Sequence, residues 1–192
     1  MEVLQTWEKN MESKKDIRKR VLVERSLLSE EIWAEKSYRI YEKVISHPIF
    51  LDADEIYCYI DFKNEVGTRK ILEEAWRLGK KVAVPKILES DMEFIYIYSQ
   101  AELSPGNWGI MEPLTNTPAD GKNVLVMMPG AVFDLDKHRI GYGKGYYDRY
   151  LAKHPYYQTM ALAFELQMLE NIPADEYDIC PQIIVTEEHI YA

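Results

Sequence analysis

The sequence predicts one domain with a three-layer α/β/α fold, in which helices cover both faces of a mostly parallel sheet. Three observations predict it. Strand-like and helix-like segments alternate along the chain, most strand-like segments are short and continuously apolar, and turn residues separate them. The chain has 192 residues, enough for one ordinary domain, and we expect that domain to span residues 1–192.

Helical segments are indicated by their composition and by the signals at their ends. Residues 14–28 contain neither Gly nor Pro. A second helix is expected to begin after Ser29, a good N-cap followed by two acidic residues, and to close at Pro48. The other expected helices are residues 68–78, which Gly79 ends, residues 145–153, and a short stretch at 165–170.

Strands are expected where β-branched and aromatic residues form short apolar runs. These runs are residues 55–60, 81–84, 94–98, 124–128, 159–164 and 183–186. Pro85 is expected to stop the second of them. Residues 99–121 hold three prolines and three glycines and are expected to form one long loop, a kind of segment that is often functional.

Composition and charge restrict the classes of partner. The net charge is −9, which argues against broad binding to nucleic acids or anionic membranes, because both are polyanions. No secretory signal and no run of about 20 apolar residues is seen, so we expect a cytoplasmic protein. Two cysteines, Cys58 and Cys180, provide no disulfide framework, and Cys58 in its apolar run is expected to be buried and inert.

Residues 128–151 concentrate groups that can bind an anion. An apolar strand leads into a loop and then a helix, and glycines alternate in the loop at Gly141, Gly143 and Gly145. Glycine permits positive φ and close approach of the backbone, and the helix N-terminus presents N–H donors. Arg139 and Lys144 add two cations for phosphate oxygens. The spacing matches neither the Walker A loop nor the Rossmann fingerprint, so this pattern alone leaves a phosphate site and an ordinary glycine-rich turn equally open.

Acidic residues around this loop also allow ordinary interpretations. Asp134, Asp136 and His138 alternate and suggest a metal site, but the EF-hand pattern fails because His138 stands where Asp or Asn belongs. We therefore favour a turn-forming or solvated acidic pair. Asp148 lies four residues after Lys144, so an ion pair on the helix surface is its alternative role.

The run PGAVFD, followed by RIGYGKGYYDRYL, resembles the signature of the 5-formyltetrahydrofolate cyclo-ligases, also called methenyltetrahydrofolate synthetases. The resemblance extends over nearly the whole chain. It includes Lys14 and Arg18 on the first helix, Glu65 after the first strand, the W-G-I-x-E-P element that starts at Trp108, and Asp178 after an Ile-Pro pair. It implies an ATP- and Mg²⁺-dependent enzyme with a fold similar to the NagB/RpiA/CoA-transferase group. That enzyme would convert 5-formyltetrahydrofolate to 5,10-methenyltetrahydrofolate.

The resemblance also implies a role for each matched residue. ATP would be held by Lys14, Arg18, Arg139, Ile140, Gly141, Tyr142, Gly143, Lys144, Gly145, Tyr146 and Tyr147. The folate would be contacted by Glu65, Trp108, Tyr142, Gly143, Lys144, Gly145 and Tyr146. Lys144 and Arg139 would be catalytic. Asp148 and Asp178 would hold Mg²⁺, directly or through water.

The sequence departs from the family's pattern at two places, and several matched residues also allow a purely structural interpretation. Lys15 could make the contact assigned to Lys14, and His138 stands where many relatives have Gly. By spacing alone, Lys14 and Arg18 would form a solvated basic face, and Glu65 would be a polar loop residue.

The remaining matches have alternatives of the same kind. Asp178 could cap a turn, with Glu176 as a rival ligand, and Trp108 could fill the core beneath a loop.

Two other functions are alternatives to the cyclo-ligase hypothesis. A sugar-phosphate isomerase or a deaminase on the same fold would use the loop for a substrate phosphate and would not consume ATP. A protein that binds folate or nucleotide without catalysis would bind 5-formyltetrahydrofolate and hydrolyse no ATP. We expect small-molecule substrates, no nucleic acid, no membrane, and a monomer or weak homodimer.

Overall fold

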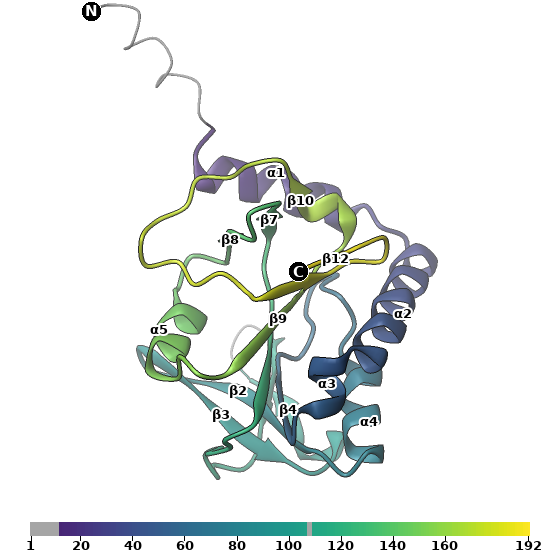
Figure 1. Cartoon of the computed structure of the whole chain (residues 1–192), viewed down its shortest axis with the longest axis vertical. Helices are drawn as coiled ribbons and strands as arrows, with labels where there is room; N and C mark the ends of the chain where they lie inside the picture. Colours follow the sequence, from purple (N-terminus) through teal and green to yellow (C-terminus); the bar gives the residue numbers. More distant parts are fainter. Residues whose placement is uncertain (1–11, 107–108) are drawn as a thin grey trace, which may run out of the picture.

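A seven-stranded sheet forms the centre of the computed structural model, which describes residues 12–106 and 109–192 (Figure 1). The strand order is β12-β11-β9-β6-β1-β2-β3. The five inner strands are parallel, while β3 and β12 pair antiparallel at the two edges. The bounds are β1 Glu55–Cys58, β2 Lys81–Leu88, β3 Asp91–Ile97, β6 Val124–Met128, β9 Gln158–Leu162, β11 Ile183–Val185 and β12 Ile190–Tyr191.

Helices cover both faces of this sheet, so the expected three-layer, mostly parallel fold is confirmed. One face carries α2 (Glu30–Ser46), α3 (Pro48–Asp52) and α4 (Arg69–Arg77). The other face carries α5 (Tyr146–Lys153). The first helix, α1 (Lys14–Ser26), lies across one end of the sheet, over a small sheet made of β10, β7 and β8 (Figure 1).

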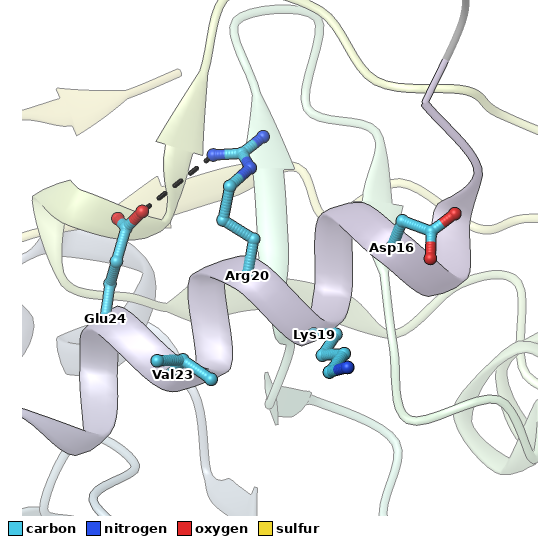
Figure 2. Close-up of a pocket in the computed structure, with 5 residues that line it drawn as sticks. All are labelled: Asp16, Lys19, Arg20, Val23 and Glu24. Atoms are coloured by element: carbon cyan, nitrogen blue, oxygen red, sulfur yellow. Dashed lines mark ion pairs between the residues drawn. The ribbon is translucent and has the colours of Figure 1, made fainter.

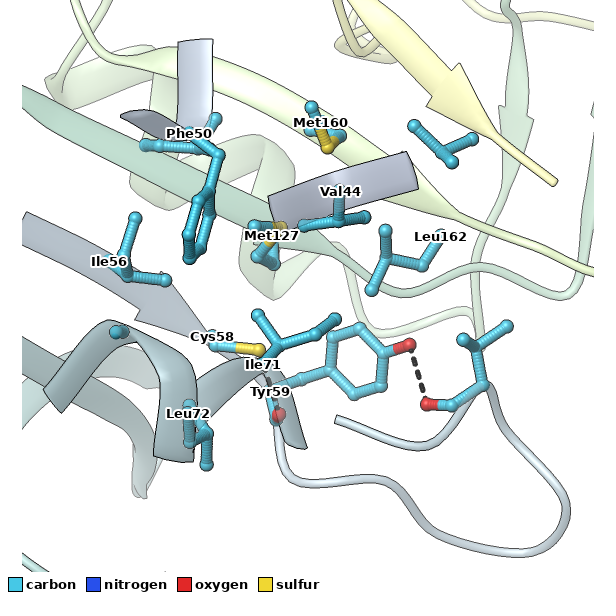
Figure 3. Packing of buried hydrophobic residues seen from close by; sticks show 14 of the residues in the cluster. Val44, Phe50, Ile56, Cys58, Tyr59, Ile71, Leu72, Met127, Met160 and Leu162 are labelled. Carbon is cyan, nitrogen blue, oxygen red and sulfur yellow. Dashed lines mark hydrogen bonds between the residues drawn. The ribbon is translucent and has the colours of Figure 1, made fainter. Parts of the chain in front are cut away.

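Two buried clusters hold the layers together, and successive residues of one strand point into different clusters. Ile56 and Cys58 of β1 pack toward α2, α3 and α4, whereas Tyr57 packs toward α5. Figure 3 shows the first cluster, where Phe50 of α3 and Ile71 of α4 are fully buried. Each such side chain contributes about 1.5–3 kcal/mol by leaving water. The expected burial of Cys58 is confirmed, and burial raises the pKa of its thiol well above the usual value.

The ends of the long helices follow the signals in the sequence. The Ser29 side chain accepts a hydrogen bond from the backbone N–H of Ile32, as expected of an N-cap. Pro48 closes α2 and also occupies the first turn of the five-residue helix α3, which the sequence pattern did not predict. The His47 side chain accepts from the N–H of Ile49 and caps this short helix.

One expected strand end is wrong, because β2 continues through Pro85 to Leu88. Its pairing with β1 ends at Ala83, and from there β2 pairs only with β3. Proline is tolerated where one side of a strand has no neighbour that needs its N–H.

Other short elements also differ from the expectation. The loop at 99–121 contains the 3₁₀ turn η2 (Gln100–Glu102) and a hairpin of β4 (Leu103–Pro105) and β5 (Met111–Pro113). The helix expected at 165–170 is only the 3₁₀ turn η4 (Glu165–Gln167), followed by β10 (Met168–Leu169). The small sheet is completed by β7 (Val132–Asp134) and β8 (Arg139–Ile140). None of the helices in the described ranges combines the length and apolarity required to span a bilayer.

The strand order creates a switch point between β1 and β6. From β1 the chain continues to β2 on one side, and it later returns to β6 on the other side. The connections after β1 and β6 therefore leave in opposite directions, and in open α/β sheets ligands bind at the carboxyl ends of the strands at such a point. Glu65 follows β1, and the glycine-rich loop follows β6 after the short strands β7 and β8, so both belong to connections that leave this switch point.

Candidate functional site

The glycine-rich loop spans residues 141–145, between β8 and the first turn of α5. Gly143 and Gly145 have φ of +89° and +63°. Residues with a Cβ adopt this backbone region only at a cost in conformational energy. At Gly141, φ is ordinary, but a Cβ would lie 2.9 Å from a guanidinium nitrogen of Arg139. Backbone conformation therefore favours glycine at 143 and 145, and a side chain at 141 would displace the Arg139 guanidinium.

The first helix brings two cations to this region. Arg18 Nη1 donates to the carbonyl oxygen of Gly141 at 3.1 Å, so this side chain contacts the loop rather than only solvent. Lys14 Nζ lies 2.5 Å from Asp178 Oδ2 and 2.6 Å from Asp175 Oδ2. Burial lowers the pKa of Lys14, but the hydrogen bonds to the two carboxylates outweigh it and the pKa is raised. Lys15 is exposed, whereas Lys14 is half-buried.

Arg139 and Asp148 form a shielded ion pair behind the loop. Arg139 Nη2 lies 2.7 Å from Asp148 Oδ1, and the Arg139 side chain is only 6% exposed. The same carboxylate oxygen accepts the N–H of Ile179 at 3.1 Å, which fixes the segment that carries Asp178 beside it. Asp148 thus pairs with Arg139 of β8 and not with Lys144.

The two aspartates predicted to hold a metal therefore lie on adjacent segments. Each aspartate uses one carboxylate oxygen for hydrogen bonds, Oδ1 in Asp148 and Oδ2 in Asp178. The second oxygen of each side chain has no hydrogen-bond partner in the described ranges. Burial raises the pKa of Asp178, but hydrogen bonds from Lys14 and from the backbone of Asp175 outweigh it and lower the pKa. A pair of carboxylates fits Mg²⁺, which takes one or two protein carboxylates together with substrate phosphates and water. Asp178 also caps the turn at Asp175, and Glu176 is exposed.

A second chain of contacts joins the loop to the segment after β1. Tyr142 Oη donates to Glu65 Oε1 at 2.5 Å and accepts from Arg25 Nη1 at 3.1 Å. Glu65 Oε2 accepts the N–H of Phe62 at 2.9 Å, so both carboxylate oxygens are held. Burial raises the pKa of Glu65, against the opposing effects of the Tyr142 hydrogen bond and the Arg25 charge. Part of the Tyr142 ring is exposed, yet burial raises the pKa of its hydroxyl.

The remaining loop residues differ in what they can offer a ligand. The Lys144 side chain is exposed, and its carbonyl oxygen accepts from Arg149 Nη1 at 2.8 Å. The ring of Tyr146 lies 5.2 Å from the Arg149 guanidinium. The Tyr147 hydroxyl is buried and has no hydrogen-bond partner in the described part of the chain. Ile140 belongs to the core beneath α1, so only its backbone can face a ligand.

The hairpin of β4 and β5 reaches toward the Glu65 segment. A Cβ on Gly109 would lie 3.9 Å from the ring of Phe62, three residues before Glu65. Trp108, the predicted folate contact on this hairpin, lies outside the described residues.

The acidic pair near the loop forms a turn. Asp134 is fully buried and accepts the N–H groups of Asp136, His138 and Ile172 at 2.8–3.1 Å. Its other contact is the His138 ring at 2.9 Å. The turn-forming interpretation of Asp134 is confirmed. Within residues 12–106 and 109–192, the one group of three potential metal ligands within 4.8 Å lies elsewhere, at Glu165, Glu188 and His189.

Two shallow hollows lie away from these contacts. Figure 2 shows one on the exposed side of α1, lined by Asp16, Lys19, Arg20, Val23 and Glu24. The other is lined by exposed residues of α2 and by the segment between β11 and β12. Neither includes a residue that the sequence assigned to a site.

Sequence reasoning missed Arg25, which is 3% exposed and contacts Tyr142. The signal was present in α1, where the buried residues are Ile17, Val21 and Arg25, at spacings of four and eight. A charged residue in the apolar stripe of a helix points into the protein and requires a partner there.

Comparisons with known proteins agree with the signature in the glycine-rich segment. Residues 10–187 match the model of the 5-formyltetrahydrofolate cyclo-ligase family. A 5-formyltetrahydrofolate cyclo-ligase of Mus musculus is 30% identical over 179 residues, which cover 84% of this chain and 87% of the relative. A probable 5-formyltetrahydrofolate cyclo-ligase of Schizosaccharomyces pombe is 32% identical and covers 85% and 89%, respectively.

Solved structures show the same relationship. The NMR structure of a 5,10-methenyltetrahydrofolate synthetase from Aquifex aeolicus superposes with a TM-score of 0.82 at 32% identity, covering 92% of this chain and 91% of that one. A 5,10-methenyltetrahydrofolate synthetase from Mycoplasma pneumoniae, at 23% identity and a TM-score of 0.76, has the same fold.

Proposed function

The chain belongs to the 5-formyltetrahydrofolate cyclo-ligase family, and from this premise we propose that it uses ATP to convert 5-formyltetrahydrofolate to 5,10-methenyltetrahydrofolate. One observation carries the proposal for this chain's own residues. The segment after β1 and the loop after β6 meet at the switch point of the sheet through the Tyr142–Glu65 hydrogen bond. A nucleotide at the loop and a folate at Glu65 would therefore lie side by side.

The reaction needs ATP because the formyl oxygen is a poor leaving group. The N5-formyl group is an amide-type carbonyl, and closing the ring onto N10 requires its oxygen to depart. Transfer of the γ-phosphoryl group to that oxygen makes it a phosphate ester and releases ADP. N10 then attacks the formyl carbon and loses its proton to solvent, and the C–O bond breaks to release inorganic phosphate. The protein's task in such a transfer is to position the reactants and to stabilise charge.

The cations around the loop suit the phosphates of ATP. Arg18 lies against the backbone at Gly141, and the exposed Lys144 ammonium stands on the loop itself. We assign Lys144 to the transferred phosphoryl group, whose charge grows during transfer. Arg139 holds Asp148 and is a third cation near the loop. Lys14 would contribute to nucleotide binding once it leaves Asp175 and Asp178.

Asp148 and Asp178 would hold Mg²⁺, which would neutralise phosphate oxygens of the bound nucleotide. The protein contributes their fixed positions. Asp148 is oriented by Arg139 and by the N–H of Ile179, and Asp178 by the N–H of Asp175.

We assign Glu65 and Tyr142 to the folate. A carboxylate on a rigid turn can accept hydrogen bonds from the N–H groups of a pterin, and the Tyr142 ring is exposed enough to pack against a planar ligand. Trp108 stays a prediction as a folate contact. The cytoplasmic location, the monomeric or weakly dimeric state and the single-domain boundary at 1–192 also stay predictions.

The test mixes purified protein, Mg²⁺-ATP and 5-formyltetrahydrofolate and follows the near-ultraviolet absorbance of the methenyl product. An ATP-dependent rise, with one phosphate released per product, is expected. Lys144→Ala should abolish most of it, while Lys19→Ala, on the exposed side of α1, should not. Folate binding without ATP turnover would favour a binding protein. If the protein neither binds folate nor turns over ATP, it has the family's fold but not this activity.

A further inference from the structure

Arg25 is a buried cation whose charge is not met by a direct carboxylate contact. Its side chain comes from the C-terminal part of α1, and the residue is 3% exposed. Within residues 12–106 and 109–192, no Asp or Glu oxygen lies within 4.0 Å of its guanidinium. Burial of a charge is unfavourable unless hydrogen bonds or an opposite charge compensate it. The positions of its hydrogen bonds therefore indicate what the residue does.

Both hydrogen bonds of Arg25 lead to Glu65. Nη1 donates to Tyr142 Oη, which in turn donates to Glu65 Oε1. Nη2 donates to the carbonyl oxygen of Lys63, two residues before Glu65, at 3.1 Å. One guanidinium thus contacts the turn that carries Glu65 and the phenol that holds its carboxylate.

The turn that carries Glu65 has a strained backbone. Lys63 and Asn64 are consecutive residues with φ of +47° and +57°. Neither is glycine, and such conformations cost about 1–3 kcal/mol each, so surrounding contacts must maintain them. The contacts present are Arg25 to Lys63, Asn64 to the carbonyl oxygen of Leu28, and the Trp33 indole N–H to the carbonyl oxygen of Glu65 at 2.7 Å.

We infer that Arg25 is a positioning residue for the folate site, which holds the Glu65 carboxylate in a fixed place through the 62–65 turn and through Tyr142. The inference rests on the proposed function only for the identity of the ligand. Because Tyr142 belongs to the glycine-rich loop, the same contacts also fix the distance between the predicted nucleotide and folate subsites. Arg25 touches neither substrate in this assignment.

The electrostatic surroundings of Glu65 make the inference measurable. The charged and titratable groups that face Glu65 come from four parts of the fold: Arg25 on α1, Tyr59 and Asp61 after β1, Tyr142 in the loop and Tyr147 on α5. Arg25 is the cation among them and favours the ionised carboxylate. Its replacement by a neutral side chain should make Glu65 take up a proton at a higher pH.

A first experiment needs no substrate and compares Arg25→Gln with Arg20→Gln by amide hydrogen exchange. Arg20 is the matched control because it lies on the exposed side of the same helix (Figure 2). In Arg25→Gln, exchange at Phe62 and Glu65, whose N–H groups close this turn, should accelerate about ten-fold or more. Equal protection of these amides in both variants would overturn the inference, whatever the protein's substrate.

A second experiment measures binding of 5-formyltetrahydrofolate without nucleotide, and of ATP without folate. Arg25→Gln should raise the Kd for 5-formyltetrahydrofolate about ten-fold or more and leave the Kd for ATP within about two-fold. The acidic limb of the folate-binding pH profile should move to higher pH, and Arg25→Lys should restore part of the affinity. Equal losses for both ligands, or an unmoved acidic limb, would show a general structural role and overturn the inference.

Tyr142→Phe keeps the inference testable if Arg25→Gln does not fold. It removes the hydroxyl that joins Arg25 to Glu65 and should also weaken folate binding, and an unchanged Kd would refute the link. A wild-type protein that fails to bind 5-formyltetrahydrofolate would contradict the proposed function, while the exchange experiment would still decide the role of Arg25.

Discussion

Replacement of Asp148 tests whether the Arg139–Asp148 pair is both a structural contact and part of the metal site. The Arg139 side chain is 6% exposed and that of Asp148 22%, so the pair is shielded from water. Asp148→Ala removes the partner of a buried guanidinium whose Nε already has no acceptor in the described ranges. Breaking a fully buried pair costs about 3–5 kcal/mol, and the partial exposure of Asp148 reduces our expectation to about 2–3 kcal/mol.

Asp148→Asn separates charge from geometry. Its amide oxygen can still accept from Arg139 Nη2 and from the N–H of Ile179, so only the difference between a charged and a neutral acceptor is lost. That difference is about 1 kcal/mol. In a domain of this size, each kcal/mol lowers Tm by about 2–4 °C. We expect Tm to fall by about 2–4 °C for Asp148→Asn and by about 4–12 °C for Asp148→Ala.

Thermal unfolding gives the first readout and the Mg²⁺ dependence of the rate gives the second. Asp148→Asn should need about ten-fold more Mg²⁺ for half-maximal rate, because an amide is a poorer Mg²⁺ ligand than a carboxylate. Asp91→Asn is the matched control, since its pair with Lys153 is exposed and is screened by solvent. Asp148→Ala that is as stable as Asp91→Asn would refute the structural part of this reasoning. An unchanged Mg²⁺ dependence in Asp148→Asn would refute the metal part.

Four further outcomes are expected. Lys144→Ala should lower kcat at least about 100-fold without changing Tm, because this side chain is exposed and we assign it to the transferred phosphoryl group; a wild-type kcat in steady-state kinetics, or a lowered Tm in thermal unfolding, would contradict this assignment. Gly143→Ala places a Cβ at φ +89°, so it should cost about 1 kcal/mol in urea unfolding and raise the KM for ATP; wild-type values for both would contradict the assigned strain. Burial, then the charge of Lys153, lowers the pKa of His154, so the unfolded state binds the proton more readily and stability should fall as pH drops below about 6.5. Urea unfolding of the wild type and of His154→Phe between pH 7.5 and 5 tests this. If the free energy of unfolding depends on pH equally in both proteins, His154 is not the cause. Phe50→Ala should cost about 3–5 kcal/mol, since the ring is fully buried between α3 and the sheet, and a smaller loss in urea unfolding would mean that neighbouring side chains fill the space.

Local signals in the sequence correctly indicated most elements of the fold. Hydrophobic runs and caps report on contacts within a few residues, which is why α1, α2 and the central strands lie close to the predicted positions. The continuation of β2 through Pro85 could not be predicted, because it depends on a partner strand on one side and its absence on the other. The helix α3 and the β4–β5 hairpin are short enough that tertiary packing decides them.

The site shows the same division between what is local and what is distant. The alternating glycines, the cations beside them and the acidic residue that follows form a signature that identifies the family, although their spacing alone leaves a phosphate site and an ordinary glycine-rich turn equally open. Which partner each charge takes is decided by the three-dimensional arrangement. Asp148 pairs with Arg139 on β8 and not with Lys144 four residues earlier.

The sequence by itself determined the layered α/β fold and the family, because these follow from periodicity and from residues close together in the chain. Only the tertiary structure decided that Arg25, Tyr142 and Glu65 form one chain of contacts. These residues are separated by up to 117 positions, and no pattern along the sequence encodes a hydrogen bond across that distance. The position of α1 across one end of the central sheet, over β10, β7 and β8, brings Arg25 to Tyr142.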